Sequence, residues 1–131
     1  MSNQSTKNTS KFYDDLVQGK ERRVLLSFEK RFNTDKIINK ILVKEYFTSE
    51  VKKLLDKNDV ALDYGCGPGA FLAIASKYCK SIIGVDISSS FVEQTNKTIM
   101  KYDLNNAKTK LIKSCDTGFK NNTFDKIIMV D

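Results

Sequence analysis

Three glycines at alternate positions follow a short apolar run, and this stretch most constrains how the chain folds. It reads Ala61-Leu62-Asp63-Tyr64-Gly65-Cys66-Gly67-Pro68-Gly69 and leads into the apolar-rich residues 70–78. Because glycine and proline together mark a tight turn at which the main chain approaches something closely, the stretch predicts a strand, a glycine turn and a helix that begins at the turn. Open α/β sheets hold nucleotide-like ligands in this arrangement.

The sequence around this turn predicts alternating strands and helices. Apolar runs predict strands at 60–62, 81–86, 109–113 and 124–130, and helical periodicity predicts helices at 70–78 and from Ser88 or Ser89 onward. Continuous apolar strands between helices are typical of a parallel sheet with both faces covered, and right-handed crossovers give it the order 3-2-1-4. The expected fold is therefore α/β, a Rossmann-like three-layer α/β/α sandwich with the glycine turn beside its topological switch point.

The chain is expected to form one domain, since 131 residues lie in the usual size range. Residues 1–10 are polar and predict a disordered tail, whereas residues 11–57 have apolar positions at helical spacing and predict an N-terminal helical segment. Residues 58–131 form the expected ligand-binding core. Because the sequence stops directly after the fourth apolar strand, we expect further chain, a second copy or a partner to cover that strand's edge.

Composition argues against several classes of function. The sequence has no histidine, so it contains no Ser-His or Cys-His nucleophile pair. Its cysteines, Cys66, Cys79 and Cys115, are widely spaced, which disfavours a metal site or a disulfide framework and indicates a cytoplasmic location. No apolar run predicts a membrane span or a secretory signal. The net charge is +6, but the basic residues are spread along the chain, so a nucleic-acid partner is not favoured.

The glycine turn by itself fits more than one nucleotide ligand. A phosphate-binding loop is absent, because no Lys-Ser or Lys-Thr pair follows the glycines. A dinucleotide fingerprint is matched by Gly65, Gly67 and Ala70, with Asp86 at about the 20-residue spacing of a ribose-binding carboxylate. The turn therefore leaves a nicotinamide dinucleotide open as a ligand.

Four segments together resemble the motifs of the class I S-adenosylmethionine-dependent methyltransferases, in the order of that family. They are residues 62–69, with an acidic residue two places before the first glycine, and residues 83–88, 114–116 and 122–131. The resemblance covers about residues 58–131. It implies an enzyme that transfers a methyl group from S-adenosylmethionine, and similarity to the small-molecule branch implies a small-molecule acceptor.

The resemblance also implies which residues bind the cofactor. Asp63 would face its ammonium group, Asp86 would accept its ribose hydroxyls, Ile87 would pack on the adenine and Asp116 would accept the exocyclic amine. The full set implied to bind the cofactor is Asp63, Gly65, Cys66, Gly67, Asp86, Ile87 and Asp116.

Several of these residues also have purely structural interpretations. Asp63 would then cap the amides of the turn, Asp116 would be an ordinary loop carboxylate, and Cys66 is expected to be a small turn residue and not a nucleophile. Gly69 is expected to allow a helix to pack closely on a strand. Methyl transfer depends mainly on alignment and on the exclusion of water, so no catalytic residue is assigned. A non-catalytic module that binds a partner through the same fold is the alternative function.

Overall fold

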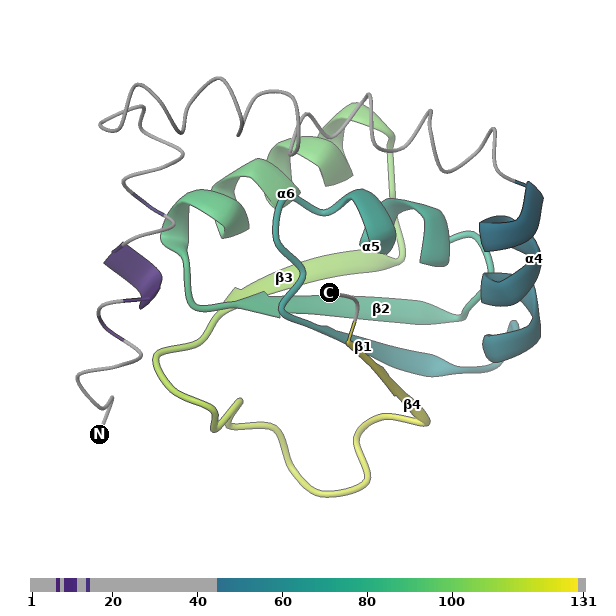
Figure 1. The fold of residues 1–131 in the computed structure, drawn as a ribbon. Coiled ribbons are helices and arrows are strands. Elements are labelled where there is room, and N and C mark those ends of the chain that lie inside the picture. Colours follow the sequence, from purple (N-terminus) through teal and green to yellow (C-terminus); the bar gives the residue numbers. More distant parts are fainter. Residues whose placement is uncertain (1–6, 8, 12–13, 15–44, 130–131) are drawn as a thin grey trace.

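Four parallel strands form one sheet in a computed structural model of the chain, which describes residues 7, 9–11, 14 and 45–129. The strands are β1 (Val60–Tyr64), β2 (Ser81–Asp86), β3 (Ala107–Leu111) and β4 (Lys126–Ile128). Their order is β3-β2-β1-β4, and all three pairings are parallel. The described helices are α4 (Glu45–Leu54), α5 (Ala70–Ala75) and α6 (Ser89–Lys101) (Figure 1). The predicted α/β fold and the strand order 3-2-1-4 are confirmed.

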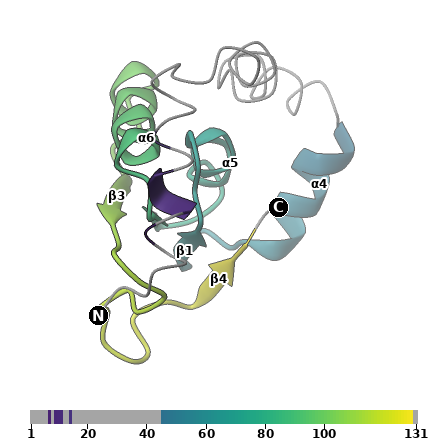
Figure 2. The ribbon, with the colours of Figure 1, turned by 60° about the vertical axis from the view of Figure 1, so that its left-hand side comes forward.

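Both faces of the sheet are covered within the described part of the chain. On one face, Ala61 and Ile82 pack against α5 and α4, and Figure 2 shows α5 and α6 on this same side. On the other face, Leu62 and Val85 pack against Ile112 and against the segment that leads from β3 to β4. The rings of Phe119 and Phe124 on that segment meet edge to face, with centroids 5.0 Å apart.

Element boundaries differ from the expected ones at several places. β1 runs to residue 64, two residues beyond the prediction, and β4 covers only 126–128 of the expected 124–130. α5 ends at Ala75 instead of Tyr78, because the amides of Lys77 and Tyr78 donate to carbonyls three residues back in a tighter turn. β3 begins two residues earlier than the predicted 109–113. Three of its five residues are exposed, so no apolar run marks where it starts.

The edges of the sheet differ in character. β3 carries two exposed lysines, Lys108 and Lys110, a feature that discourages pairing with another chain. Within the described residues β4 pairs with β1 alone, and Ile127 and Met129 are 64% and 73% exposed. Coverage of this edge by further chain, a second copy or a partner stays a prediction.

The N-terminal region is described only in part. Residues 12–13 and 15–44, over which most of the N-terminal helices are expected, lie outside the described residues. α4 forms the end of that segment, with Lys52 and Lys53 in its last turn as the helix dipole favours. Lys7, residues 9–11 and Asp14 are helical. Residues 1–6 and 8 lie outside the described residues, so the disordered tail over residues 1–10 stays a prediction. Among the described residues, no helix combines the length and apolar character needed to cross a membrane.

Gly84 in the middle of β2 allows the chain above the sheet to lie directly on the strand. A Cβ at this position would lie 2.7 Å from Cδ1 of Leu72 and 2.8 Å from Cβ of Cys66. Such distances are too short for any side chain, so only glycine fits there. The close approach of helix to strand that was expected at Gly69 therefore occurs at Gly84, and it places the glycine turn against the end of β2.

Candidate ligand-binding site

The glycine turn between β1 and α5 is held by the neighbouring strand. The amides of Gly65 and Cys66 both donate to the carbonyl of Val85, at 2.9 and 3.0 Å. Gly65, Gly67 and Gly69 have φ values of +77°, +53° and +87°, in the left-handed region that other residues adopt only with strain. The alternate glycines are thus explained by backbone conformation before any ligand is considered.

Two buried threonines of α6 form hydrogen bonds with carbonyl groups of the glycine turn. Thr95 donates its hydroxyl hydrogen to the carbonyl of Gly67 at 2.8 Å. The hydroxyl of Thr98 is shared between the carbonyl of Pro68 at 3.3 Å and that of Gln94, within α6, at 3.1 Å. A Cβ on Gly69 would lie 2.8 Å from Cγ2 of Thr95, so this glycine lets α6 approach, and not a strand as expected. Sequence reasoning missed both threonines as turn contacts, although their i, i+3 spacing places them on one face of the helix.

Gly65 and Gly67 differ from the packed glycines because they face open space. A Cβ built on either of them would meet no described atom within 4 Å. The main chain of the turn is therefore accessible at these two residues, whereas it is covered at Gly69 and Gly84. This contrast indicates where a ligand would lie against the backbone.

Asp63 is a buried carboxylate with an unsatisfied oxygen. It is 2% exposed, and its Oδ2 accepts a hydrogen bond from no described group. Burial, and secondarily the charge of Asp86, raises its pKa from 3.8 to about 7. The amides of Gly65, Gly67 and Gly69 donate to other acceptors, so the cap interpretation of Asp63 does not account for this oxygen. A positively charged donor would satisfy Oδ2.

Asp86, at the end of β2, connects the glycine turn to the start of α6. Its Oδ2 accepts from the amide of Gly67 and its Oδ1 from the amide of Ser88, both at 2.9 Å. Burial raises the pKa of Asp86, and these two hydrogen bonds oppose the shift by favouring the ionised form. Each carboxylate oxygen keeps a lone pair for a further donor, as binding of ligand hydroxyls requires.

Cys66 contributes its backbone and its small size to the turn. Its side chain is 6% exposed and packs under Gly84. Burial raises the pKa of its thiol to about 12, and the charges of Asp63 and Asp86 act in the same direction. A thiol that stays protonated at neutral pH is a poor nucleophile, in keeping with the structural interpretation of this residue.

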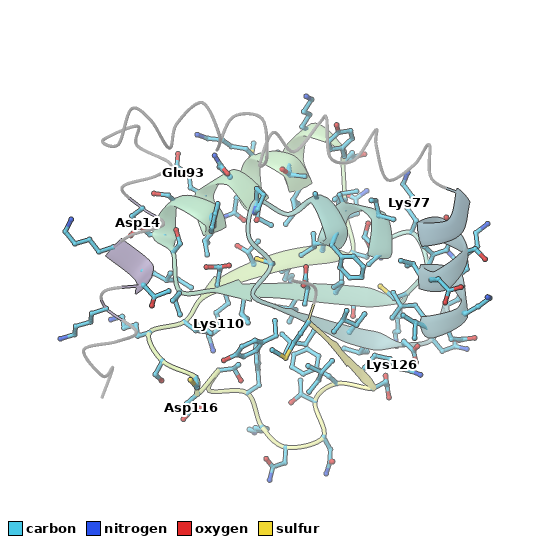
Figure 3. The ribbon with its side chains drawn as sticks, in the orientation of Figure 1. Asp14, Lys77, Glu93, Lys110, Asp116 and Lys126 are labelled. Atoms are coloured by element: carbon cyan, nitrogen blue, oxygen red, sulfur yellow. The ribbon has the colours of Figure 1, made fainter. Side chains whose placement is uncertain are left out.

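The remaining two candidates lie at the edge of this arrangement. Ile87 is half-buried beside Asp86 and packs with the cluster on the face opposite the helices. Asp116 is exposed on the segment after β3 (Figure 3), where its Oδ1 accepts from the amide of Gly118 at 2.8 Å. That segment is tied to the end of β1, because the hydroxyl of Tyr64 donates to the Cys115 carbonyl at 3.3 Å.

Of the seven candidates, the structure therefore brings five into one site, places Ile87 at its edge beside Asp86 and leaves Asp116 apart. The residues that meet are Asp63, Gly65, Cys66, Gly67 and Asp86. Among the described residues, Asp116 forms no hydrogen bond with any of them, and no three Cys, Asp or Glu side chains gather as a metal site would require.

Known proteins resemble this chain over the segment that contains these site residues. The sequence profile of a family described as a methyltransferase domain matches residues 61–131, more than half of the chain. A curated relative, the probable cobalt-precorrin-6B C(15)-methyltransferase (decarboxylating) of Methanocaldococcus jannaschii, is 33% identical over 52 residues. The match covers 40% of this chain and 28% of the relative.

Solved structures share the fold. The YcgJ protein of Bacillus subtilis is 23% identical with a TM-score of 0.58, covering 62% of this chain and 35% of that one. Geranyl diphosphate C-methyltransferase of Streptomyces coelicolor A3(2) is 18% identical with a TM-score of 0.57, covering 73% and 38%. A dimethyladenosine transferase of Plasmodium falciparum is 20% identical with a TM-score of 0.57, covering 66% and 32%. The chain thus spans about a third of the length of these structures.

The raised pKa of Asp63 predicts a specific pH dependence of stability. Because the folded protein holds a proton that the unfolded chain releases, the free energy of unfolding falls as pH rises from about 4 to about 7. Asp63→Asn abolishes this titration, so the wild-type protein should lose up to about 4 kcal/mol relative to the variant over that range. Urea denaturation of both proteins between about pH 4 and pH 8 measures the difference in their free energies of unfolding. A difference that does not change with pH would contradict the raised pKa of Asp63.

Proposed function

Because the chain belongs to the methyltransferase-domain family, of the class I S-adenosylmethionine-dependent kind, we propose that it binds S-adenosylmethionine against the glycine turn and Asp86 and methylates a small molecule. The observation that carries the proposal is the pairing of open space over Gly65 and Gly67 with the unsatisfied oxygen of Asp63. Because the chain belongs to this family, S-adenosylmethionine is favoured over a nicotinamide dinucleotide as the ligand of the turn.

The residues present fit this cofactor. Asp63 would hold its ammonium group, directly or through a water molecule, and the open backbone of Gly65 and Gly67 would lie against it. Asp86, already fixed by two amides, would accept its ribose hydroxyls. Ile87 and Asp116 are proposed to contact the adenine. The contact of Asp116 requires its carboxylate to accept a further donor besides the amide of Gly118.

The chain contributes to the reaction mainly by binding and orientation. S-adenosylmethionine supplies a methyl group on a sulfonium, which a nucleophilic atom of the acceptor takes up in line. Because charge disperses along this path, a site gains most by aligning the reactants and excluding water. The buried acids Asp63 and Asp86 and the hydrogen-bonded turn would fix the donor side of that alignment. No residue is assigned as a general acid or base.

A small-molecule acceptor is the finer part of the proposal. Its support is the curated relative named for methylation of a cobalt precorrin, together with a structural neighbour named for geranyl diphosphate. Another neighbour is named a dimethyladenosine transferase, so RNA is the acceptor class to test against. The three cysteines, all free thiols, support a cytoplasmic location as part of this proposal.

Cofactor binding tests the site directly. S-adenosylhomocysteine, the product form of the cofactor, should bind the purified protein in titration calorimetry, and NAD should bind more weakly or not at all. Asp86→Ala should weaken binding of S-adenosylhomocysteine by more than about 1 kcal/mol, because it leaves ribose hydroxyls and two backbone amides without their acceptor. Glu50→Ala, which removes an exposed carboxylate paired with Lys53 on α4, should leave affinity unchanged. Tighter binding of NAD, or equal affinity of the Asp86→Ala protein, would refute the proposed site.

The acceptor class needs a separate experiment. The protein is incubated with S-adenosylmethionine labelled on its methyl group and with small-molecule, RNA and protein fractions of a cell extract in parallel. We expect label to enter the small-molecule fraction and to depend on Asp86. Transfer to RNA or protein with none to small molecules would overturn the acceptor assignment and leave the cofactor assignment intact.

A further inference from the structure

Two polar residues of the N-terminal helical region contact the turn that follows β2. Ser10 donates its hydroxyl hydrogen to the carbonyl of Ile87 at 2.6 Å. Asp14 accepts from the hydroxyl of Ser88 at 2.6 Å and from the amide of Ser90 at 3.1 Å, both through Oδ1. The four-residue spacing of Ser10 and Asp14 places them on one face of a helix. Figure 3 shows Asp14 beside the beginning of α6.

Asp14 completes the cap of α6 from outside the helix. Ser88 is the N-cap residue, and its Oγ accepts from the amide of Phe91 at 3.2 Å. A serine hydroxyl has one hydrogen to donate, and here Asp14 receives it, which orients Oγ toward Phe91. Ser88 is fully buried, so solvent does not replace the carboxylate. A negative charge at this end of a helix also interacts favourably with the helix dipole.

The contact continues into the proposed cofactor site. The amide of Ser88 donates to Oδ1 of Asp86, whose Oδ2 accepts from the amide of Gly67. A chain of neighbouring residues therefore runs from Asp14 through Ser88 and Asp86 to the glycine turn. Between Asp86 and Ser88, Ser10 holds the carbonyl of Ile87. The turn over residues 86–88 is thus bound on its outer side by Ser10 and Asp14 and on its inner side by Gly67.

We propose that Ser10 and Asp14 are positioning residues that hold the turn over residues 86–88 in the conformation that binds the nucleoside half of the cofactor. The proposal rests on the proposed function, since it assigns to Asp86 the ribose and to Ile87 the adenine. Both residues act through the turn: Asp14 by fixing Ser88, and Ser10 by fixing the backbone of Ile87. Through these two hydrogen-bonded residues the N-terminal region then contributes to cofactor affinity.

Substitution of Asp14 tests the proposal with a conservative rescue. Asp14→Ala should lower the affinity for S-adenosylhomocysteine about tenfold, because it removes the charged acceptor of Ser88 and Ser90. Asp14→Asn keeps an oxygen at the Oδ1 position and should recover a large part of that loss. Glu93→Ala is the matched control, since it removes an exposed carboxylate of α6 that pairs with Lys97 at 2.8 Å, and its affinity should equal that of the wild type.

Hydrogen exchange supplies a second readout. The amides of Ser88, Ser90 and Phe91 should exchange faster in the Asp14→Ala protein than in the Glu93→Ala protein. Ser10→Ala, which removes a single hydrogen bond, should weaken binding about threefold and serves as an independent variant if Asp14→Ala does not fold.

The outcomes separate this inference from the proposed function. If the wild-type protein binds S-adenosylhomocysteine and both Asp14→Ala and Ser10→Ala bind it equally well, the positioning role is wrong and the cofactor assignment stands. Equal losses in Asp14→Ala and Asp14→Asn would also overturn it, because the acceptor oxygen would then not matter. Failure of the wild-type protein to bind would overturn the proposed function itself.

Discussion

The site depends on one buried carboxylate that two backbone turns share. Asp86 accepts an amide hydrogen from Gly67 in the turn after β1 and another from Ser88 in the turn after β2. Hydrogen bonds to an ionised acceptor are stronger than neutral ones, and Asp86 is only 8% exposed, so water competes little for it. The two turns are therefore fixed relative to each other before a ligand arrives. Such preorganisation reduces the ordering cost of binding.

α6 also connects the turn after β2 to the glycine turn after β1. Its N-cap residue Ser88 donates to Asp86 and Asp14, while Thr95 and Thr98 on its buried face donate to the carbonyls of Gly67 and Pro68. The glycine turn is thus bound through its amides by the sheet and Asp86, and through its carbonyls by the helix. Gly69 and Gly84 allow these contacts by admitting Thr95 and Cys66 at distances that no Cβ would permit. Gly65 and Gly67 are left with one open side, which is where a ligand would enter.

The sequence predicted the architecture well because that architecture follows from local patterns and a handedness rule. Continuous apolar runs identify buried parallel strands, and right-handed crossovers then determine the order of the sheet. The predicted start of β3 was two residues too late. Most of its side chains are exposed, so no apolar pattern marks its beginning, which is determined by its pairing with β2. The second helix was predicted to begin at Ser88 or Ser89, and in the structure it begins at Ser89 with Ser88 as its N-cap residue.

The missed contacts all depend on partners remote in the sequence. Ser10 ends the polar residues 1–10, and Asp14 follows the aromatic pair Phe12-Tyr13. Their partners Ile87 and Ser88 lie more than 70 residues away, so no local pattern pairs them. Thr95 carries no local signal of its role, because its hydroxyl acceptor, the carbonyl of Gly67, comes from another segment. The three glycines of the turn look alike in the sequence, and only the structure separates Gly69, which faces Thr95, from Gly65 and Gly67, which face open space. Gly84 was the one detectable case, since a glycine inside a strand often marks a close approach.

The central claim is that the unsatisfied carboxylate of Asp63 is completed by the ammonium group of the cofactor. Proton release on binding measures this most directly. At about pH 6, where the raised pKa keeps Asp63 largely protonated, binding of S-adenosylhomocysteine should release a proton that the Asp63→Asn protein does not release. Calorimetric titrations in buffers of different ionisation enthalpy give the number of protons released. Equal proton release by the wild-type and Asp63→Asn proteins would contradict the account.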